Sequence, residues 1–381
     1  MSDPPSKPPL ALQSSRWNRW TKWGVFSLIP TVCLIALLEL SIRIVGLDQP
    51  HLRSPFLTAE FQQVHQSDDD LFFSLRPNLR TLWQGAQLTT NSLGLRYREF
   101  GPKRPGDFHI LSLGESTTFG ALVEDHQTYS ALLERYLQEL DHSHTYCVIN
   151  AGVSAYTSFQ SLRYLELRGL KVQPDMVLFY HEANDYLPSS IRERGGSSDE
   201  LGLSLTDRQL YESTKYWLYR KLLACSATCR FIAFQAARRR ISGLQGRDGS
   251  ADDPNAQIVA QFKSVATPGG IRRLDLPPRV TPEERKENLE RLWSLCREHG
   301  IILVVIHPSY ALSTQHECEL TEFCKRRNVP TIDAFHSIHP DWAESDELFL
   351  DLFHPNPQGH ERLAKDLLAF LVERRLVPFA K

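Results

Sequence analysis

The sequence predicts an α/β fold in which helices cover both faces of one parallel sheet. Five short apolar segments, rich in β-branched residues, alternate with amphipathic segments of helical length between residues 109 and 374. The apolar segments have no polar face, which is typical of parallel strands that are buried on both sides. Alternation of this kind favours a sheet between two layers of helices. We therefore expect a flavodoxin-like three-layer α/β/α domain with about five parallel strands.

The expected elements follow one another in a regular order. The strands lie at residues 109–114, 146–152, 175–182, 301–307 and 331–335. The helices lie at about 127–140, 157–169, 282–299, 316–326 and 357–374. Far more residues separate the third and fourth strands than one crossover helix requires, so we expect a helical insertion at about 187–280. Its basic stretch at 230–240 fits a bilayer surface, a cover over the ligand site or a solvated helix face.

The N-terminal region carries one candidate membrane-spanning helix. Residues 24–38 contain no charge, and the apolar character continues past Glu39 and Arg43 to Leu47. This length is enough for one crossing, which needs about 20 residues. A buried core helix and a cleaved signal peptide are the alternatives, but no small-x-small cleavage site follows the apolar run. We expect membrane attachment through this one helix.

The charges around this helix predict its orientation. Lys7, Arg16, Arg19 and Lys22 precede it, whereas only Arg43 and Arg53 follow it closely. The positive-inside rule then predicts a single-pass protein of the cell inner membrane with its main domain on the periplasmic or extracellular side. The expected units are a cytoplasmic tail at 1–22, a transmembrane signal anchor at 23–47, an irregular lead-in that packs on the domain at 48–107, and the α/β domain at 108–376.

Composition and charge exclude several classes of protein. Of 381 residues, 41% are hydrophobic and 23% are charged, which excludes a polytopic membrane protein and a wholly disordered chain. Because 43 basic and 45 acidic side chains nearly balance, we expect no nucleic-acid partner. Six of the seven cysteines lie in the exported part, where disulfides are permitted. Cys225 with Cys229 and Cys318 with Cys324 are the nearest pairs, and buried free thiols are equally compatible.

Polar side chains gather where ligands bind in such sheets, beyond the carboxyl ends of the strands. The first strand runs directly into Gly114-Glu115-Ser116, which places a serine at this edge, where it could also serve as a helix cap. Asp351 and His354 stand three residues apart just ahead of the last helix. A carboxylate that accepts from one imidazole nitrogen leaves the other nitrogen to take a proton from the serine. These three residues are candidates for a catalytic triad.

Two further strand ends offer hydrogen-bond donors. The second strand closes with Asn150-Ala151-Gly152 and the third with Ala183-Asn184-Asp185. The backbone N–H of Gly152 and the side-chain amide of Asn184 are candidates for an oxyanion hole, in which each donor contributes about 3 kcal/mol to acyl transfer. Taken singly, a tight turn explains Gly152 and a turn cap explains Asn184. Together with Ser116 and His354, in this chain order, a shared role is the better explanation.

This order of residue types resembles the SGNH/GDSL hydrolases, which are named for serine, glycine, asparagine and histidine. The resemblance covers about residues 89–374 and rests on GESTTFG, NAG, AND and DLFHPNPQGH. The upstream segment TTNSLGLR, at 89–96, is similar to the lead-in of membrane-anchored bacterial members. Two positions depart from the family pattern. Glu115 replaces the usual Asp, and Glu182 stands where the third block has glycine, so that its carboxylate is a possible substrate-binding group.

The resemblance implies a role for each site residue. Ser116 is then the nucleophile and donates to the oxyanion through its own N–H. Gly152 and Asn184 complete the oxyanion hole, and His354 is the base with Asp351 as its partner. The resemblance implies no cofactor and no metal. An ordinary α/β-hydrolase is disfavoured because the sequence contains no G-x-S-x-G elbow.

The expected function is that of a serine esterase acting on O-acyl groups, above all acetyl groups, of envelope glycans or lipids through an acyl-serine intermediate. An O-acyltransferase would use the same residues. Metal-assisted hydrolysis at His336 and His339, with acidic residues nearby, is a further alternative. A non-catalytic envelope module that binds glycans is the last one, because fold does not fix function. The sequence predicts no oligomeric state.

Overall fold

The computed structural model describes most of the α/β domain and the N-terminal helix. The described residues are 17–47, 61–181, 183–187, 205–213, 217–218, 221–222, 225–232, 235, 278–307, 319–334, 345–351 and 354–379.

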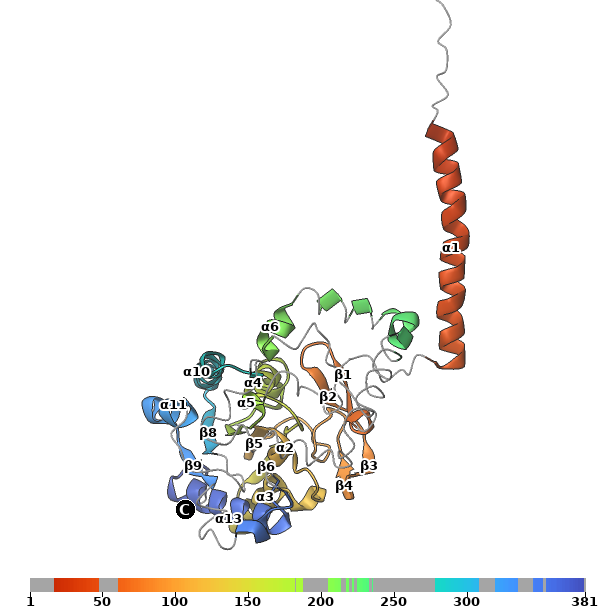
Figure 1. The fold of residues 1–381 in the computed structure, drawn as a ribbon. Helices are drawn as coiled ribbons and strands as arrows, with labels where there is room; N and C mark the ends of the chain where they lie inside the picture. Colours follow the sequence, from red (N-terminus) through yellow and green to blue (C-terminus); the bar gives the residue numbers. More distant parts are fainter. Residues whose placement is uncertain are drawn as a thin grey trace, which may run out of the picture.

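A five-stranded parallel sheet forms the centre of the molecule (Figure 1). Its strands are β5 (Asp107–Gly114), β6 (Thr145–Asn150), β7 (Met176–Tyr180), β8 (Ile302–His307) and β9 (Thr331–Asp333). They lie in the order β6-β5-β7-β8-β9, and every neighbouring pair is parallel. All five predicted strands are confirmed. The order reverses between β5 and β7, which makes their carboxyl ends the topological switch point at which such folds bind ligands.

Helices cover both faces of this sheet, and all five predicted helices are confirmed. One face carries α3 (Tyr129–Leu140) and α13 (Pro357–Glu373), which pack with strand residues such as Ile110 and Leu178. The other face carries α4 (Ser158–Leu167), α10 (Pro282–Glu298) and α11 (Glu319–Arg327), which share a core with Leu111 and Phe179. Successive residues of one strand therefore enter opposite cores, which explains why the strands have no polar face.

The sequence encodes the starts of the two longest domain helices. Thr281 and Glu284 form a reciprocal capping box, and Pro282 takes the first position of α10. The side chain of Asn356 accepts from the N–H groups of the first turn of α13, which also begins with a proline. These caps fix α13 directly after the segment that carries His354.

Two antiparallel hairpins precede the sheet, where the sequence analysis expected irregular chain. They pair β1 (His65–Asp68) with β2 (Phe72–Leu75) and β3 (Arg80–Trp83) with β4 (Ala86–Thr89). Each strand has only four residues, too few to establish an alternating pattern in the sequence. The hairpins pack on the domain, with the ring of Trp83 edge-on to that of Phe119 at 5.5 Å. The lead-in is thereby joined to the region just after Ser116.

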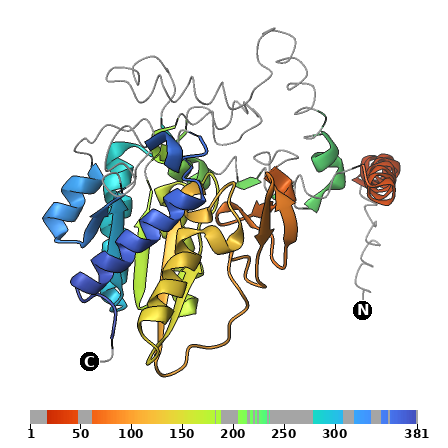
Figure 2. The ribbon, with the colours of Figure 1, turned by 90° about the horizontal axis from the view of Figure 1, so that it is seen from below.

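One long apolar helix, α1 (Trp17–Val45), stands outside the domain (Figures 1 and 2). Its segment Leu28–Val45 is long and apolar enough to cross a membrane and is almost wholly exposed. By length and composition alone, this helix fits either a signal anchor or a signal peptide. In the insertion, α6 (Asp207–Glu212) is helical, and so are the described residues from 217 to 235 apart from Ser226.

Candidate active site

Helix α2 (Ser116–Phe119) places the candidate nucleophile at the carboxyl edge of the sheet. It begins directly after β5, with Glu115 at the N-cap position, so Ser116 is not the cap of this helix. Gly114 permits this sharp junction, because a Cβ there would overlap Thr118 and lie 2.8 Å from the carbonyl oxygen of Tyr180. Ser116 is half-buried between buried neighbours. The hydroxyl is therefore held on a short, tightly packed element.

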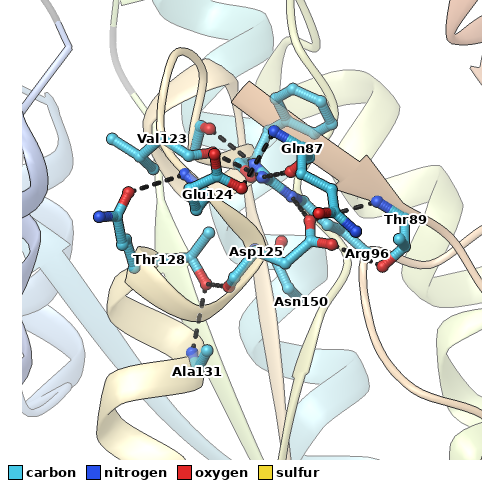
Figure 3. Close-up of polar contacts among 12 residues, drawn as sticks. Gln87, Thr89, Arg96, Val123, Glu124, Asp125, Thr128, Ala131 and Asn150 are labelled. Carbon is cyan, nitrogen blue, oxygen red and sulfur yellow. Dashed lines mark hydrogen bonds and ion pairs between the residues drawn. The ribbon is translucent and has the colours of Figure 1, made fainter. Parts of the chain in front are cut away.

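A buried arginine of the lead-in fixes the other end of α2 (Figure 3). The Nη1 group of Arg96 donates to the carbonyl oxygens of Phe119 at 2.7 Å and Gly120 at 2.6 Å, and Nη2 donates to that of Val123 at 2.6 Å. Its Nε bonds to Asp125 at 2.7 Å, and only 2% of its side chain is exposed. Carbonyl groups at a helix end otherwise have no partner. Arg96 closes the TTNSLGLR segment, which the sequence analysis noted only as a resemblance.

The structure brings His354 and Asp351 together. The Nδ1 atom of His354 lies 2.7 Å from Oδ2 of Asp351, and the backbone N–H of His354 donates to Oδ1 at 2.8 Å. The histidine side chain is 8% exposed and the aspartate side chain 36%. Two bonds to one carboxylate fix both the loop and the ring. A carboxylate can only accept a hydrogen bond, so Nδ1 faces an acceptor and Nε2 is the ring nitrogen that does not contact Asp351.

Tyr129 joins the helix that carries Ser116 to the helix that follows His354. Its hydroxyl lies 3.0 Å from Oγ1 of Thr118, two residues after the serine. Its backbone N–H donates to Nδ1 of His360 at 3.2 Å, and the two rings stack at 6.2 Å. His360 belongs to the first turn of α13. The start of α2 and the start of α13 therefore lie at the same end of the sheet.

Gly152 has a different environment from the one expected. Its N–H, the predicted oxyanion donor, donates to Oδ1 of Asn150 at 2.9 Å, and the amide of Asn150 donates to the carbonyl oxygen of Thr118 at 2.7 Å. A Cβ at Gly152 would overlap the backbone nitrogen of Phe119. The close approach of this loop to α2 is therefore enough to require glycine.

Three residues further along the same loop, Ala155 has an unusual backbone. Its φ of 66° lies in the left-handed region, which non-glycine residues seldom adopt and which clusters at functional sites. Its carbonyl oxygen accepts from Arg279 at 2.8 Å. Within the part of the chain that the structure describes, no hydrogen bond engages its N–H. Ala155 is not among the residues predicted from the sequence, because no sequence pattern marks an alanine with positive φ.

Asn184 follows β7, the strand next to β5, whose end carries Ser116. It belongs to the short helix α5 (Ala183–Tyr186), which follows β7. Its backbone N–H donates to Oε2 of Glu115 at 3.1 Å, and its side-chain amide donates to the carbonyl oxygen of Tyr156 at 3.1 Å. An amide nitrogen has a second hydrogen that this bond does not use. Glu115 therefore joins the ends of β5 and β7 and positions Asn184 beside the serine.

Buried ion pairs connect the insertion to the same loops. The guanidinium of Arg279 pairs with Asp207 at 2.9 Å, and both side chains are almost completely buried. Arg285 pairs with Asp185 at 3.4 Å, next to Asn184. Burial raises the pKa of the Asp185 carboxyl, and the charge of Arg285 opposes this shift. The two ends of the insertion thus meet at the candidate site.

Three buried histidines predict an acid-sensitive fold. Burial, the largest cause, lowers the pKa of His65, His181 and His360 from 6.5 to about 3. As the pH falls from 6.5 towards 3, the unfolded chain binds protons that the folded chain does not bind, so the free energy of unfolding falls. Each histidine contributes a slope of at most about 1.4 kcal/mol per pH unit.

Denaturant titrations of the full chain in detergent at pH 7.5 and 5.5 measure this effect. We expect His360→Gln to reduce the difference between the two pH values. His299→Gln, which changes an exposed histidine, should leave it unchanged. If the free energy of unfolding changes equally with pH in His360→Gln and in the parent protein, His360 does not contribute to the acid sensitivity.

Several predicted residues lie outside the described residues. They are Glu182, Cys318, His336 and His339. Within the described residues, no group of three or more His, Cys, Asp or Glu side chains could hold a metal ion. Cys225 and Cys229, the nearest described pair, are free thiols and do not form a disulfide.

Taken together, a parallel sheet in this order, with serine, asparagine and an Asp–His pair beyond its strands, is the three-layer α/β/α fold of the SGNH type. A model of the GDSL-like lipase/acylhydrolase family matches residues 112–362. The chain therefore belongs to this family and is a hydrolase acting on ester bonds. No curated protein matches the sequence significantly.

The chain is also similar to solved structures at low identity. A lipase/acylhydrolase from Enterococcus faecalis is 17% identical, with 70% of this chain and 96% of that chain covered and a TM-score of 0.40. An acetylxylan esterase from Geobacillus stearothermophilus is 14% identical, with 69% and 94% covered and a TM-score of 0.40. A two-domain esterase active on acetylated mannans is 14% identical, with a TM-score of 0.39. The alignment covers 73% of this chain but only 52% of that esterase, so this chain spans about half of its length. The family assignment rests on the family match alone.

Proposed function

We propose that the protein is a serine esterase in which Ser116, His354 and Asp351 form the catalytic triad. The observation that carries this proposal is the 2.7 Å bond between Nδ1 of His354 and Asp351. It sets the ring tautomer that a general base requires. Tyr129 supports the proposal further, because it joins the helix of Ser116 to the helix that follows His354.

The proposed reaction proceeds through an acyl-serine. The hydroxyl oxygen of Ser116 attacks the ester carbonyl carbon while Nε2 of His354 accepts its proton. The carbon–oxygen bond to the alcohol then breaks, and His354 returns the proton to the leaving oxygen. Water, activated by the same histidine, releases the acid. An acceptor hydroxyl in place of water would make the same residues an acyltransferase.

The oxyanion requires donors at the same edge of the sheet. We assign this role to the N–H of Ser116, which begins α2, and to the side-chain amide of Asn184. For the third donor, the N–H of Ala155 is the stronger candidate than that of Gly152, because Gly152 already donates to Asn150. The left-handed backbone of Ala155 is the strained geometry expected of such a donor.

We further propose that α1 is a signal anchor that ties the domain to the outer face of the cell inner membrane. The exposed apolar surface of Leu28–Val45 and the four basic residues before it support this orientation. An exported domain at the membrane suits acyl groups of envelope glycans or lipids as substrates, with acetylated glycans as the first class to test.

A fluorophosphonate probe tests the triad, because it phosphonylates only an activated serine. We expect mass spectrometry of the labelled full chain to locate the probe on Ser116. Labelling should be lost in His354→Ala and kept in His299→Ala, which removes an exposed histidine. A label on another serine, or unchanged labelling of Ser116 in His354→Ala, would contradict the triad. Release of acetate from acetylated glycans, with and without an acceptor sugar, separates hydrolysis from transfer.

A further inference from the structure

The insertion presents an exposed apolar face. Trp217, Leu218 and Leu222 are 50%, 52% and 47% exposed. With Lys221 and Cys225, which are also exposed, they recur at a spacing that places them on one side of a helix. Ile232 continues the exposed apolar surface at 61%. Grouped apolar side chains of this size mark a binding surface on a folded protein.

This part of the insertion is bonded to α1. The carboxylate of Glu39 accepts from the N–H groups of Ala227 and Thr228 at 2.6 and 2.9 Å, and also from the hydroxyls of Ser226 and Thr228. Arg43 bonds to Glu39 at 2.7 Å and to the carbonyl oxygen of Cys225 at 2.8 Å. Glu39 thus occupies the start of the helical residues 227–232. The insertion is held against α1 by charged side chains of α1 itself.

The contact between the insertion and α1 lies within the apolar segment of this helix. Glu39 lies six residues before Val45, the end of the apolar segment, which corresponds to about 9 Å along a helix. The insertion therefore meets α1 beside the apolar segment rather than beyond it. In Figure 1 the last green helical piece after α6 lies near the lower part of α1, and Figure 2 shows it beside α1 viewed end-on.

We propose that the described residues Trp217, Leu218, Leu222 and Ile232 form a second membrane contact, in which their side chains enter the interface of the bilayer that α1 crosses. The proposal rests on α1 as the anchor. Tryptophan prefers the headgroup level, and leucine and isoleucine reach the acyl boundary below it. Residues 225–228, between Leu222 and Ile232, bond to α1 within its apolar segment, and the exposed apolar side chains beside them would otherwise lie in water. A lipid surface is therefore the occupant that fits.

The contact has a consequence for the catalytic domain. Arg279 and Asp207, at the two ends of the insertion, form a buried ion pair. Arg279 also donates to the carbonyl oxygen of Ala155, so the insertion contacts the candidate site. A membrane contact in the middle of the insertion then fixes how the site faces the bilayer, because it adds a second point of attachment to that of α1.

Site-specific fluorescence of the full chain tests the proposal. An environment-sensitive fluorescent amino acid replaces Leu222, Leu140 or Ile35 in protein reconstituted into vesicles of phosphatidylethanolamine and phosphatidylglycerol. Leu140 is the control, because it is 55% exposed at the end of α3. Ile35 reports the anchor, because it is 59% exposed within the apolar segment of α1. Lipids with a nitroxide on the acyl chain quench from the membrane, and iodide quenches from water.

We expect the lipid nitroxide to quench the labels at 222 and 35 several-fold more than the label at 140, and iodide to show the reverse order. Quenching at 35 with equal results at 222 and 140 would overturn the membrane contact while leaving the anchor intact. Protection of position 222 from both quenchers would also overturn it, because it indicates a protein partner such as a second copy. Absence of lipid quenching at 35 would refute the anchor together with the contact. The rate of ester hydrolysis by the protein in the same vesicles tests the proposed function separately.

Discussion

Replacing Ser116 by alanine is expected to lower kcat for p-nitrophenyl acetate by about 10⁶-fold, the loss typical of removing the nucleophile of a serine hydrolase. The fold should persist, because Ser116 is half-buried and Glu115 occupies the cap position of α2. An unchanged melting temperature would show this. Steady-state kinetics of the purified full chain measure the rate.

The matched control is Ser154→Ala, which removes another serine at the same edge of the sheet. This residue lies on the loop after β6 and is buried. We expect Ser154→Ala to retain activity. If Ser116→Ala hydrolyses the ester as fast as the parent protein, the nucleophile lies elsewhere and the triad is wrong.

Replacing Arg96 by methionine is expected to destabilise the domain by about 1–3 kcal/mol for each buried carbonyl oxygen that loses its only donor. The partly exposed carboxylate of Asp125 also loses its ion-pair partner. The substitution removes the donor to the carbonyl oxygen of Phe119 and one of two donors to that of Gly120, which also accepts from the N–H of Val123. Because α2 carries Ser116, kcat should fall more than KM rises. Arg96→Lys should rescue little, since an ammonium cannot reproduce the planar fork that reaches several carbonyls at once.

Arg98→Met is the control for this experiment. Arg98 lies two residues away and also forms an ion pair, with Glu134, but 54% of its side chain is exposed. Exposed pairs contribute about 0–1 kcal/mol, so stability and kcat should change little. Thermal and denaturant unfolding of both variants, together with their kinetics, measure the contrast. Equal losses in the two variants would contradict a special role for Arg96.

The sheet was predictable because burial on both faces leaves a plain signal in the sequence. Strands such as β5 and β7 are continuous apolar runs, and the helices between them carry caps such as Thr281 with Glu284. Strand ends in a parallel sheet share one edge, so Ser116 and Asn184 could be located without knowledge of side-chain contacts. The pairing of Asp351 with His354 followed from their short spacing.

Other features depend on contacts that no local pattern encodes. The bonds of Arg96 reach carbonyl groups more than 20 residues away, so the sequence shows only an arginine after a turn. The sequence predicts Gly152 as an oxyanion donor, but it does not show that the N–H of Gly152 bonds to Asn150 or that its missing side chain admits α2. The hairpins β1–β2 and β3–β4 are too short to show a period, and their stability comes from packing on the domain.

The contact between Tyr129 and His360 joins positions 231 residues apart in the chain. Ser116 and His354 are separated by a similar length of chain, so the ribosome synthesises the proposed nucleophile long before its base. An incompletely exported polypeptide carries Ser116 without His354 and has no means of activating it. On this proposal, ester cleavage begins only once α13 has docked on α3, so the enzyme stays inert during its own synthesis and passage across the membrane.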